Sequence, residues 1–157
     1  MKQLLIILIS FLLLSSPVIG QETGILFRDT PYSKWVEGGK KWLSSGEEKT
    51  HAKYKGEIRN NVPHGNGVIS HEGRQIYVGG FKDGEFYGQG ILTLRDGGKY
   101  EGEIKNGLPN GYGKETYPGG SMFVGEWKDG WEWNGTGYNK DGKIKYTYVN
   151  GVWLPSK

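Results

Sequence analysis

The chain has 157 residues, of which 28 are Gly, 6 Trp, 10 Tyr and 5 Phe, while only 35% are hydrophobic. A helix loses about 1 kcal/mol for each interior Gly, so this composition disfavours helical bundles and favours an all-β fold of short strands and tight turns. The net charge of +3, with basic and acidic residues interleaved, gives no basic stripe for nucleic acid, and the absence of Cys excludes disulfides, thiolate metal sites and Cys nucleophiles.

Residues 1–20 are predicted to be a signal peptide. Lys2 precedes an apolar run from Leu4 to Leu14, and a Ser-Ser-Pro break separates this run from the expected cleavage site after Gly20. An uncleaved membrane anchor is the alternative, but a spanning helix needs about 20 apolar residues. We therefore expect an exported protein, periplasmic or secreted, whose net charge falls from +3 to +2 with the loss of Lys2.

Residues 21–53 are predicted to form a degenerate N-terminal cap on the repeats that follow. The expected strands are Ile25–Arg28 and Trp35–Trp42, the second of them around Gly38-Gly39. This segment is too short for a catalytic domain, and terminal repeats commonly differ from the rest because they close an exposed edge.

A pattern of aromatic and glycine residues recurs with a period of 23 residues. It defines four units, 54–76, 77–99, 100–122 and 123–145, and residues 146–157 are the expected C-terminal cap. Each unit contains an aromatic-x-Gly motif, a polar turn, a Gly-x-Gly pair and a second glycine turn. The leading aromatic residues of the four units are Tyr54, Tyr77, Tyr100 and Phe123.

Each unit is predicted to be a β-hairpin, because 23 residues hold two strands of about five residues with two turns. In the third unit, Tyr100, Gly102 and Ile104 alternate with Glu101 and Glu103. One face of the sheet should therefore carry aromatic rings and glycines, and the other face charged side chains. The glycine leaves room for a neighbouring ring, and the turn sequences Lys-Asp-Gly and Lys-Asn-Gly supply the positive φ that tight hairpins need.

The fourth unit departs from this pattern. Aligning its Gly-x-Gly pair on Gly135 and Gly137 gives its first turn one extra residue, within Trp131–Asn134, and makes its second segment one residue shorter. Such departures are candidates for function, since the repeat itself does not require them.

The pattern Tyr-x-Gly-Glu-aromatic-Lys-Asn-Gly-x-x-x-Gly-x-Gly resembles the MORN (membrane occupation and recognition nexus) repeat. Residues 100–118 are the nearest to a consensus copy, and the resemblance covers residues 54–145. It implies an elongated, twisted antiparallel sheet of stacked hairpins with a groove lined by the aromatic positions. It also implies a scaffold for protein–protein contact or dimerisation, and phospholipid binding has been proposed for some members of the family.

Nothing in the sequence points to catalysis. His51, His64 and His71 lack metal-ligand spacing, the glutamates that recur with the period are structural by default, and the Gly-x-Gly pairs lack the strand-to-helix context of a phosphate loop. We predict no catalytic residue, no cofactor and no metal site.

Aromatic residues are the candidates for contact with a partner. Packing alone explains the four leading aromatics, unless the groove leaves them partly exposed, whereas Tyr112, Trp131 and Trp133 are not demanded by the repeat. The full set of predicted groove residues is Tyr54, Tyr77, Tyr100, Tyr112, Phe123, Trp131 and Trp133.

Three kinds of partner remain open. A protein partner bound in an aromatic groove is the preferred hypothesis. A membrane surface is the second, although no polybasic cluster that would attract anionic lipid is present. A cell-wall glycan is the third, because aromatic platforms also suit sugars. Unpaired sheet edges are in addition a candidate surface for a homodimer, and nucleic acid is not expected.

Overall fold

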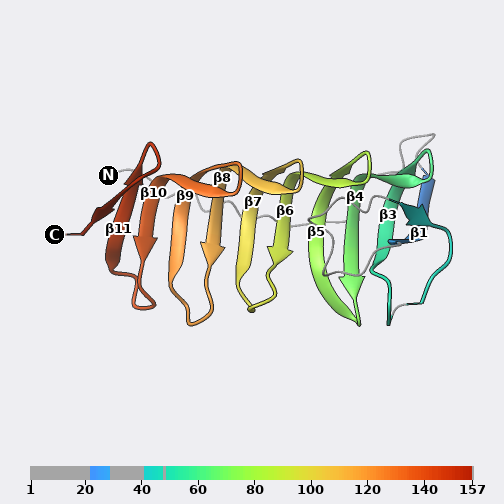
Figure 1. Cartoon of the computed structure of the whole chain (residues 1–157), viewed down its shortest axis with the longest axis horizontal. Coiled ribbons are helices and arrows are strands. Elements are labelled where there is room, and N and C mark those ends of the chain that lie inside the picture. The colour runs from blue at the N-terminus through green and yellow to red at the C-terminus, as the bar shows by residue number, and fades with distance from the viewer. Residues whose placement is uncertain (1–21, 29–40, 48, 157) are drawn as a thin grey trace.

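The structure is a computed structural model that describes residues 22–28, 41–47 and 49–156. Within these residues all regular structure is β-strand, and twelve strands form one antiparallel sheet. The strands cross the sheet in chain order, except that β1 lies between β3 and β2. Figure 1 shows them side by side along the long axis of the molecule, with turns at both margins. The predicted all-β sheet of stacked hairpins is confirmed.

The first unit is preceded by two strands and the fourth is followed by two. The strands are β1 (Glu22–Arg28), β2 (Trp42–Leu43), β3 (Lys53–Arg59), β4 (Val62–His71), β5 (Arg74–Lys82), β6 (Glu85–Thr93), β7 (Lys99–Lys105), β8 (Leu108–Thr116), β9 (Met122–Lys128), β10 (Trp131–Tyr138), β11 (Ile144–Val149) and β12 (Val152–Pro155).

The polar turns inside the units are two-residue turns with positive φ, as the sequence predicts. Asn106 and Gly107, for example, have φ of 53° and 78°, the conformation that type I′ hairpins require. The turn also ties consecutive hairpins together, because the amide of Gly107 donates to the carbonyl of Phe86 at 3.1 Å. The amides of Gly84 and Gly130 make the corresponding bonds to the carbonyls of Pro63 and Pro109, each in the preceding unit.

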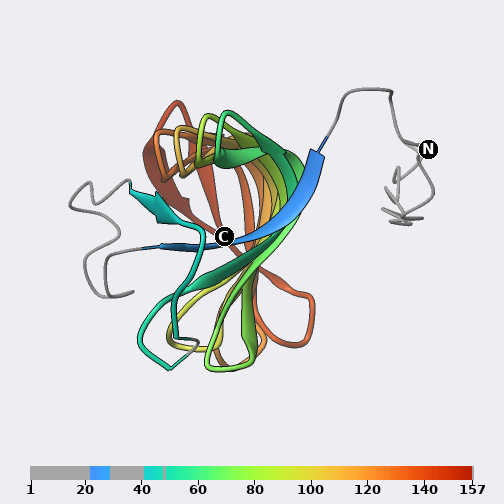
Figure 2. The ribbon, with the colours of Figure 1, turned by 90° about the vertical axis from the view of Figure 1, so that its right-hand side faces the viewer.

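Glycines of consecutive strands lie opposite one another and form a row across the sheet. A Cβ atom on Gly102 would lie 2.5 Å from the Cα atom of Gly113, and one on Gly113 would lie 2.5 Å from Cζ of Tyr100. Neither position can therefore hold a side chain while the backbones stay this close. Figure 2, a view along the sheet, shows that the strands bend strongly across their length. The glycine row consists of Gly24, Gly56, Gly67, Gly79, Gly90, Gly102, Gly113, Gly125 and Gly135.

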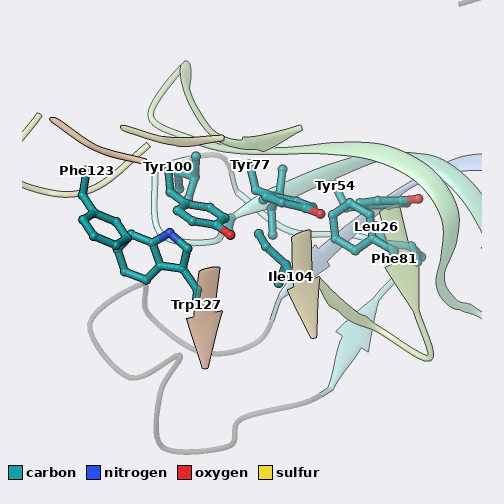
Figure 3. Close-up of a cluster of buried hydrophobic side chains, with 11 residues drawn as sticks. Leu26, Tyr54, Tyr77, Phe81, Tyr100, Ile104, Phe123 and Trp127 are labelled. Carbon is teal, nitrogen blue, oxygen red and sulfur yellow. The ribbon is translucent and has the colours of Figure 1, made fainter. Parts of the chain in front are cut away.

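The core is a single file of rings packed on this glycine row. The four leading aromatics are at most 1% exposed, and Figure 3 shows them one after another with Phe81, Ile104 and Trp127 below them. The Tyr100 hydroxyl donates to the backbone carbonyl of Glu103 at 2.8 Å, as Tyr54 and Tyr77 do to the residues three positions after them. Within the described residues no second layer covers the sheet, and the sheet buries its rings by bending around them (Figure 2). We call this side of the sheet the aromatic face.

The alignment of the fourth unit with the other three was wrongly predicted from the sequence. Its turn is the ordinary two-residue turn Asp129-Gly130, with φ of 49° and 87°, so no residue is added there. Strand pairing places Gly135 opposite Gly125, which makes Gly135, and not Gly137, the last member of the glycine row. Both glycines fit the Gly-x-Gly pattern, and only the backbone hydrogen-bond ladder distinguishes them.

With Gly135 in the glycine row, the segment that leads from the turn to this row is one residue shorter in the fourth unit than in the third, and not one residue longer. Pro109 and Gly113 are four positions apart in β8, whereas their counterparts Glu132 and Gly135 are three positions apart in β10. The missing residue is regained inside β11, where a register shift places Ile144 and Tyr146 opposite the adjacent residues Tyr138 and Gly137. The carbonyl of Trp133, inside the shortened segment, accepts a hydrogen bond at 2.8 Å from the turn amide of Gly151, which anchors the last hairpin.

The two ends of the array are completed by short strands. β1 contains the predicted strand Ile25–Arg28 and pairs directly with β3, placing Leu26 opposite Tyr54. Of the predicted strand Trp35–Trp42, the positions before residue 41 lie outside the described residues, and Trp42 begins β2. At the other end, β11 and β12 form one more hairpin, and all four residues of β12 are exposed.

Candidate functional site

The structure separates the seven predicted groove residues into two groups. The four leading aromatics, Tyr54, Tyr77, Tyr100 and Phe123, lie under their neighbours with almost no accessible surface. They are packing residues of the aromatic face, and a partner could reach them only if neighbouring side chains moved.

The other three are accessible, but they do not form one site. Tyr112 is 70% exposed and Trp131 is 77% exposed, while Trp133 is half-buried. Trp131 and Trp133 line the same cavity, and Tyr112 is not part of that lining.

This cavity has a volume of about 660 Å³ and lies where the repeats end, between β8 and the β11–β12 turn. Six of its lining residues are aromatic and three are acidic, with one lysine. We call it the C-terminal cavity. Its lining residues are Glu115, Tyr117, Trp127, Lys128, Asp129, Gly130, Trp131, Glu132, Trp133, Tyr146, Tyr148 and Gly151.

Glu115 occupies a position that is aliphatic in the first two units. It lies between the leading aromatics of the third and fourth units in the strand register, opposite Tyr100 on one side and Phe123 on the other. The equivalent residues, each 23 positions earlier, are Leu92 and Ile69. The aromatic face therefore contains a carboxyl group where the repeat otherwise places a hydrocarbon side chain.

Glu132 is a second acid at an apolar repeat position. It lies opposite Trp127 at the start of β10, and the equivalent residues of the earlier units are Pro109, Phe86 and Pro63. Sequence reasoning missed both acids because it treated glutamates as surface elements of the repeat. The signal was present in the sequence: reading each period position down the four units shows an acid replacing apolar residues.

Two tyrosines hold the carboxylate of Glu132. The hydroxyls of Tyr117 and Tyr146 both donate to its Oε1 atom, the second at 3.0 Å. Burial, and next the charge of Glu132, raises the pKa of Tyr146 to about 12. Burial and the hydrogen bond to Glu132 raise the pKa of Tyr117 as well. Both hydroxyls are therefore protonated donors at neutral pH.

Glu115 resists ionisation in this setting. Burial is the main cause that raises the pKa of its carboxyl from 4.5 to about 7, and the negative charges of Glu132 and Asp96 add to it. Removal of a carboxylate from water disfavours its charged form, and nearby like charges act in the same direction. At neutral pH this side chain thus exchanges between charged and neutral forms.

Two further groups in the wall bear on what the cavity can hold. The ammonium group of Lys128 lies over the ring of Trp133, 4.4 Å from its centroid. The indole Nε1 of Trp127 is buried without a hydrogen-bond partner among the described residues. Figure 3 shows this nitrogen on the edge of the indole that faces Tyr100.

The part of the chain that the structure describes also bears on metal binding and on membrane spanning. It contains no group of three or more His, Asp or Glu side chains that could hold a metal ion. His51 contacts the hydroxyl of Thr50, and His64 lies 3.5 Å from a carboxylate oxygen of Asp83. Among these same residues there is no helix of the length and hydrophobicity needed to cross a membrane.

Comparison with known families finds one match. The family model of the MORN repeat matches residues 54–71, 77–99 and 100–122, which cover most of the first unit and all of the second and third. The fourth unit, whose second strand is shortened, lies outside these matches. No curated protein matches the chain.

Proposed function

This chain carries MORN repeats, which are in general modules for interaction with proteins or membranes, and we propose that it is an exported, non-catalytic scaffold that binds a protein partner. The surface that we assign to the partner is at the C-terminal end of the sheet. Export is supported by the predicted signal peptide of residues 1–20, which lie outside the described part of the chain.

The concentration of exposed apolar side chains at this end supports the proposal. Among the described residues, eleven large hydrophobic side chains are exposed, and six of them fall within residues 131–154. Exposed apolar side chains that gather at one end of a molecule are typical of interaction sites, and Trp is enriched in such interfaces. We call this set the C-terminal apolar surface: Trp131, Ile144, Val149, Val152, Trp153 and Leu154.

A membrane surface is the second candidate, and a smaller cavity favours it. This cavity, of about 260 Å³, is lined by Arg74, Arg95 and His71 together with Glu72 and others. Cationic side chains around a hollow suit the phosphate of an anionic lipid. Co-sedimentation with anionic vesicles that is lost in the Arg74→Ala/Arg95→Ala variant would favour this function over the protein partner.

The protein-partner proposal is tested by affinity capture with the full chain as bait. The double variant Trp131→Ala/Trp153→Ala removes the two largest side chains of the C-terminal apolar surface. The matched control is Tyr87→Ala/Val124→Ala, whose side chains are also exposed but lie elsewhere on the sheet. Circular dichroism checks that all the proteins are folded.

We expect the wild type and the control to recover the same partner from the exported fraction, and the tryptophan variant to lose it. Recovery of the chain itself would identify a homodimer through this end of the sheet. Equal recovery by all three baits would contradict the proposal.

A further inference from the structure

We propose that the C-terminal cavity is a binding site for an alkylammonium cation, held by the carboxylates of Glu115 and Glu132 among aromatic walls. This site goes beyond the scaffold function, since it is a cavity for a small group; it shares Trp131 with the C-terminal apolar surface assigned to a protein partner.

The first argument is that the fold does not require these two acids. The first three units build the same hairpins with Pro or Phe at the position of Glu132, and the first two with Ile or Leu at that of Glu115. A half-buried carboxylate in an apolar row opposes folding unless it is compensated. Two such substitutions fall on different strands and still converge on one cavity, and a bound cation would compensate both.

The second argument is the fixed orientation of Glu132. Tyr117 and Tyr146, on opposite sides of β10 in the sheet, both donate to its Oε1 atom. Among the described residues no hydrogen bond to Oε2 is formed. The carboxylate is therefore held in place by one oxygen while the other is left for a ligand, and an oriented charge of this kind binds without first losing side-chain freedom.

The third argument is the composition of the wall. Three carboxylates, on Glu115, Asp129 and Glu132, face a single cation, Lys128, so the cavity is negative when they are ionised. The faces of Trp and Tyr rings attract ammonium groups, most strongly when the groups are shielded from water. The Lys128 ammonium lies over Trp133, which shows that a cation fits against this ring.

The same wall argues against other ligands. A metal ion needs several oxygen ligands at short range, and the described residues contain no group of that kind. A neutral sugar would use the aromatic rings and would donate hydroxyl groups to the carboxylates, but it would leave their negative charges uncompensated.

The proposal is tested by titrating the full chain with choline and with 3,3-dimethylbutan-1-ol, which has the same shape without the charge. Isothermal calorimetry measures affinity, and the fluorescence of the tryptophans in the wall reports occupancy. We expect choline to bind about tenfold or more tightly than its neutral isostere, the factor that corresponds to one desolvated cation–π or ionic contact. A lysine amide and phosphatidylcholine vesicles, titrated in parallel, show whether the group comes from a protein, a lipid or a free solute.

Variants assign the binding to the two acids. Glu132→Gln and Glu115→Gln should each weaken choline binding about tenfold. The control Glu103→Gln removes the same charge from the opposite, exposed face and should leave binding unchanged. Glu115→Gln is informative because it should stabilise the fold while it weakens binding, which a merely structural role of Glu115 would not do.

The proposal is overturned if the neutral isostere binds as well as choline, if neither binds, or if both glutamine variants retain wild-type affinity. None of these results bears on the scaffold function, because the capture experiment depends on Trp131, Trp153 and a protein partner. Conversely, choline binding that survives in Trp153→Ala would support the cavity even if no protein partner were found.

Discussion

Replacement of Glu115 by glutamine should make the protein more stable at neutral and alkaline pH. The side chain stands between Tyr100 and Phe123 in a row that is otherwise apolar, and Glu132 and Asp96 repel its charge. Glutamine has nearly the same shape without the charge. The variant therefore removes the unfavourable ionisation and leaves the packing in place.

The sign and size follow from the pKa of Glu115, which the fold raises from 4.5 to about 7. The folded state then holds this proton more tightly than the unfolded state does, so the associated stability is present below about pH 4.5 and is lost as the pH rises through 7. If the whole difference between the two pKa values contributed to stability, it would amount to about 3 kcal/mol, at about 1.36 kcal/mol per pKa unit. Because the carboxyl is only half-buried, solvent screens it, and we expect about 1–2 kcal/mol.

The assay is urea unfolding followed by tryptophan fluorescence, at a series of pH values from about 4.5 to about 8. The free energy of unfolding of Glu115→Gln should equal that of the wild type at the acid end and exceed it by about 1–2 kcal/mol at the alkaline end. Glu103→Gln, which changes an exposed side chain, is the control for a general charge effect. A difference between Glu115→Gln and wild type that does not change with pH would refute the reasoning.

Two further predictions rest on the structure, and one rests on the sequence. Gly113→Ala should lower the free energy of unfolding by about 1–3 kcal/mol, because its Cβ atom would lie 2.5 Å from Cζ of Tyr100. Urea unfolding measures this loss, and an unchanged midpoint would contradict the packing of rings on the glycine row. Lys128→Met should tighten choline binding measured by calorimetry, because the Lys128 ammonium occupies the face of Trp133 that choline would use. Weaker binding would mean that this lysine helps to form the site. Mass spectrometry of the exported protein should find Gln21 as its first residue, and an intact N-terminus would instead favour a membrane anchor.

The architecture was largely predictable from the sequence because its signals are local. The spacing of 23 residues, the Asn-Gly and Asp-Gly turns with positive φ, and the alternation of Tyr100, Gly102 and Ile104 with charged residues all appear in the structure as expected. Each signal acts within one hairpin, so no distant contact is needed to interpret it.

The frame of the fourth unit was not predictable in the same way. Gly135 and Gly137 both satisfy the Gly-x-Gly pattern, and the choice between them depends on which one pairs with Gly125 across the sheet. The two glycines are two residues apart, so either choice keeps each side chain on the same face and changes only its neighbours on the adjacent strands. Backbone hydrogen bonding between strands settles this choice, and sequence spacing does not.

The sequence by itself determined that the chain forms a repeated β-sheet with a core of rings over glycines, because each of these features follows from residue type and period. Only the tertiary structure decided which aromatic residues are accessible, burying Tyr100 and its three equivalents while exposing Trp131. It also brought Glu115 and Glu132 to one cavity from different strands. Accessibility and convergence depend on how the sheet bends and on the register of neighbouring strands, and both are properties of the assembled sheet rather than of any single hairpin.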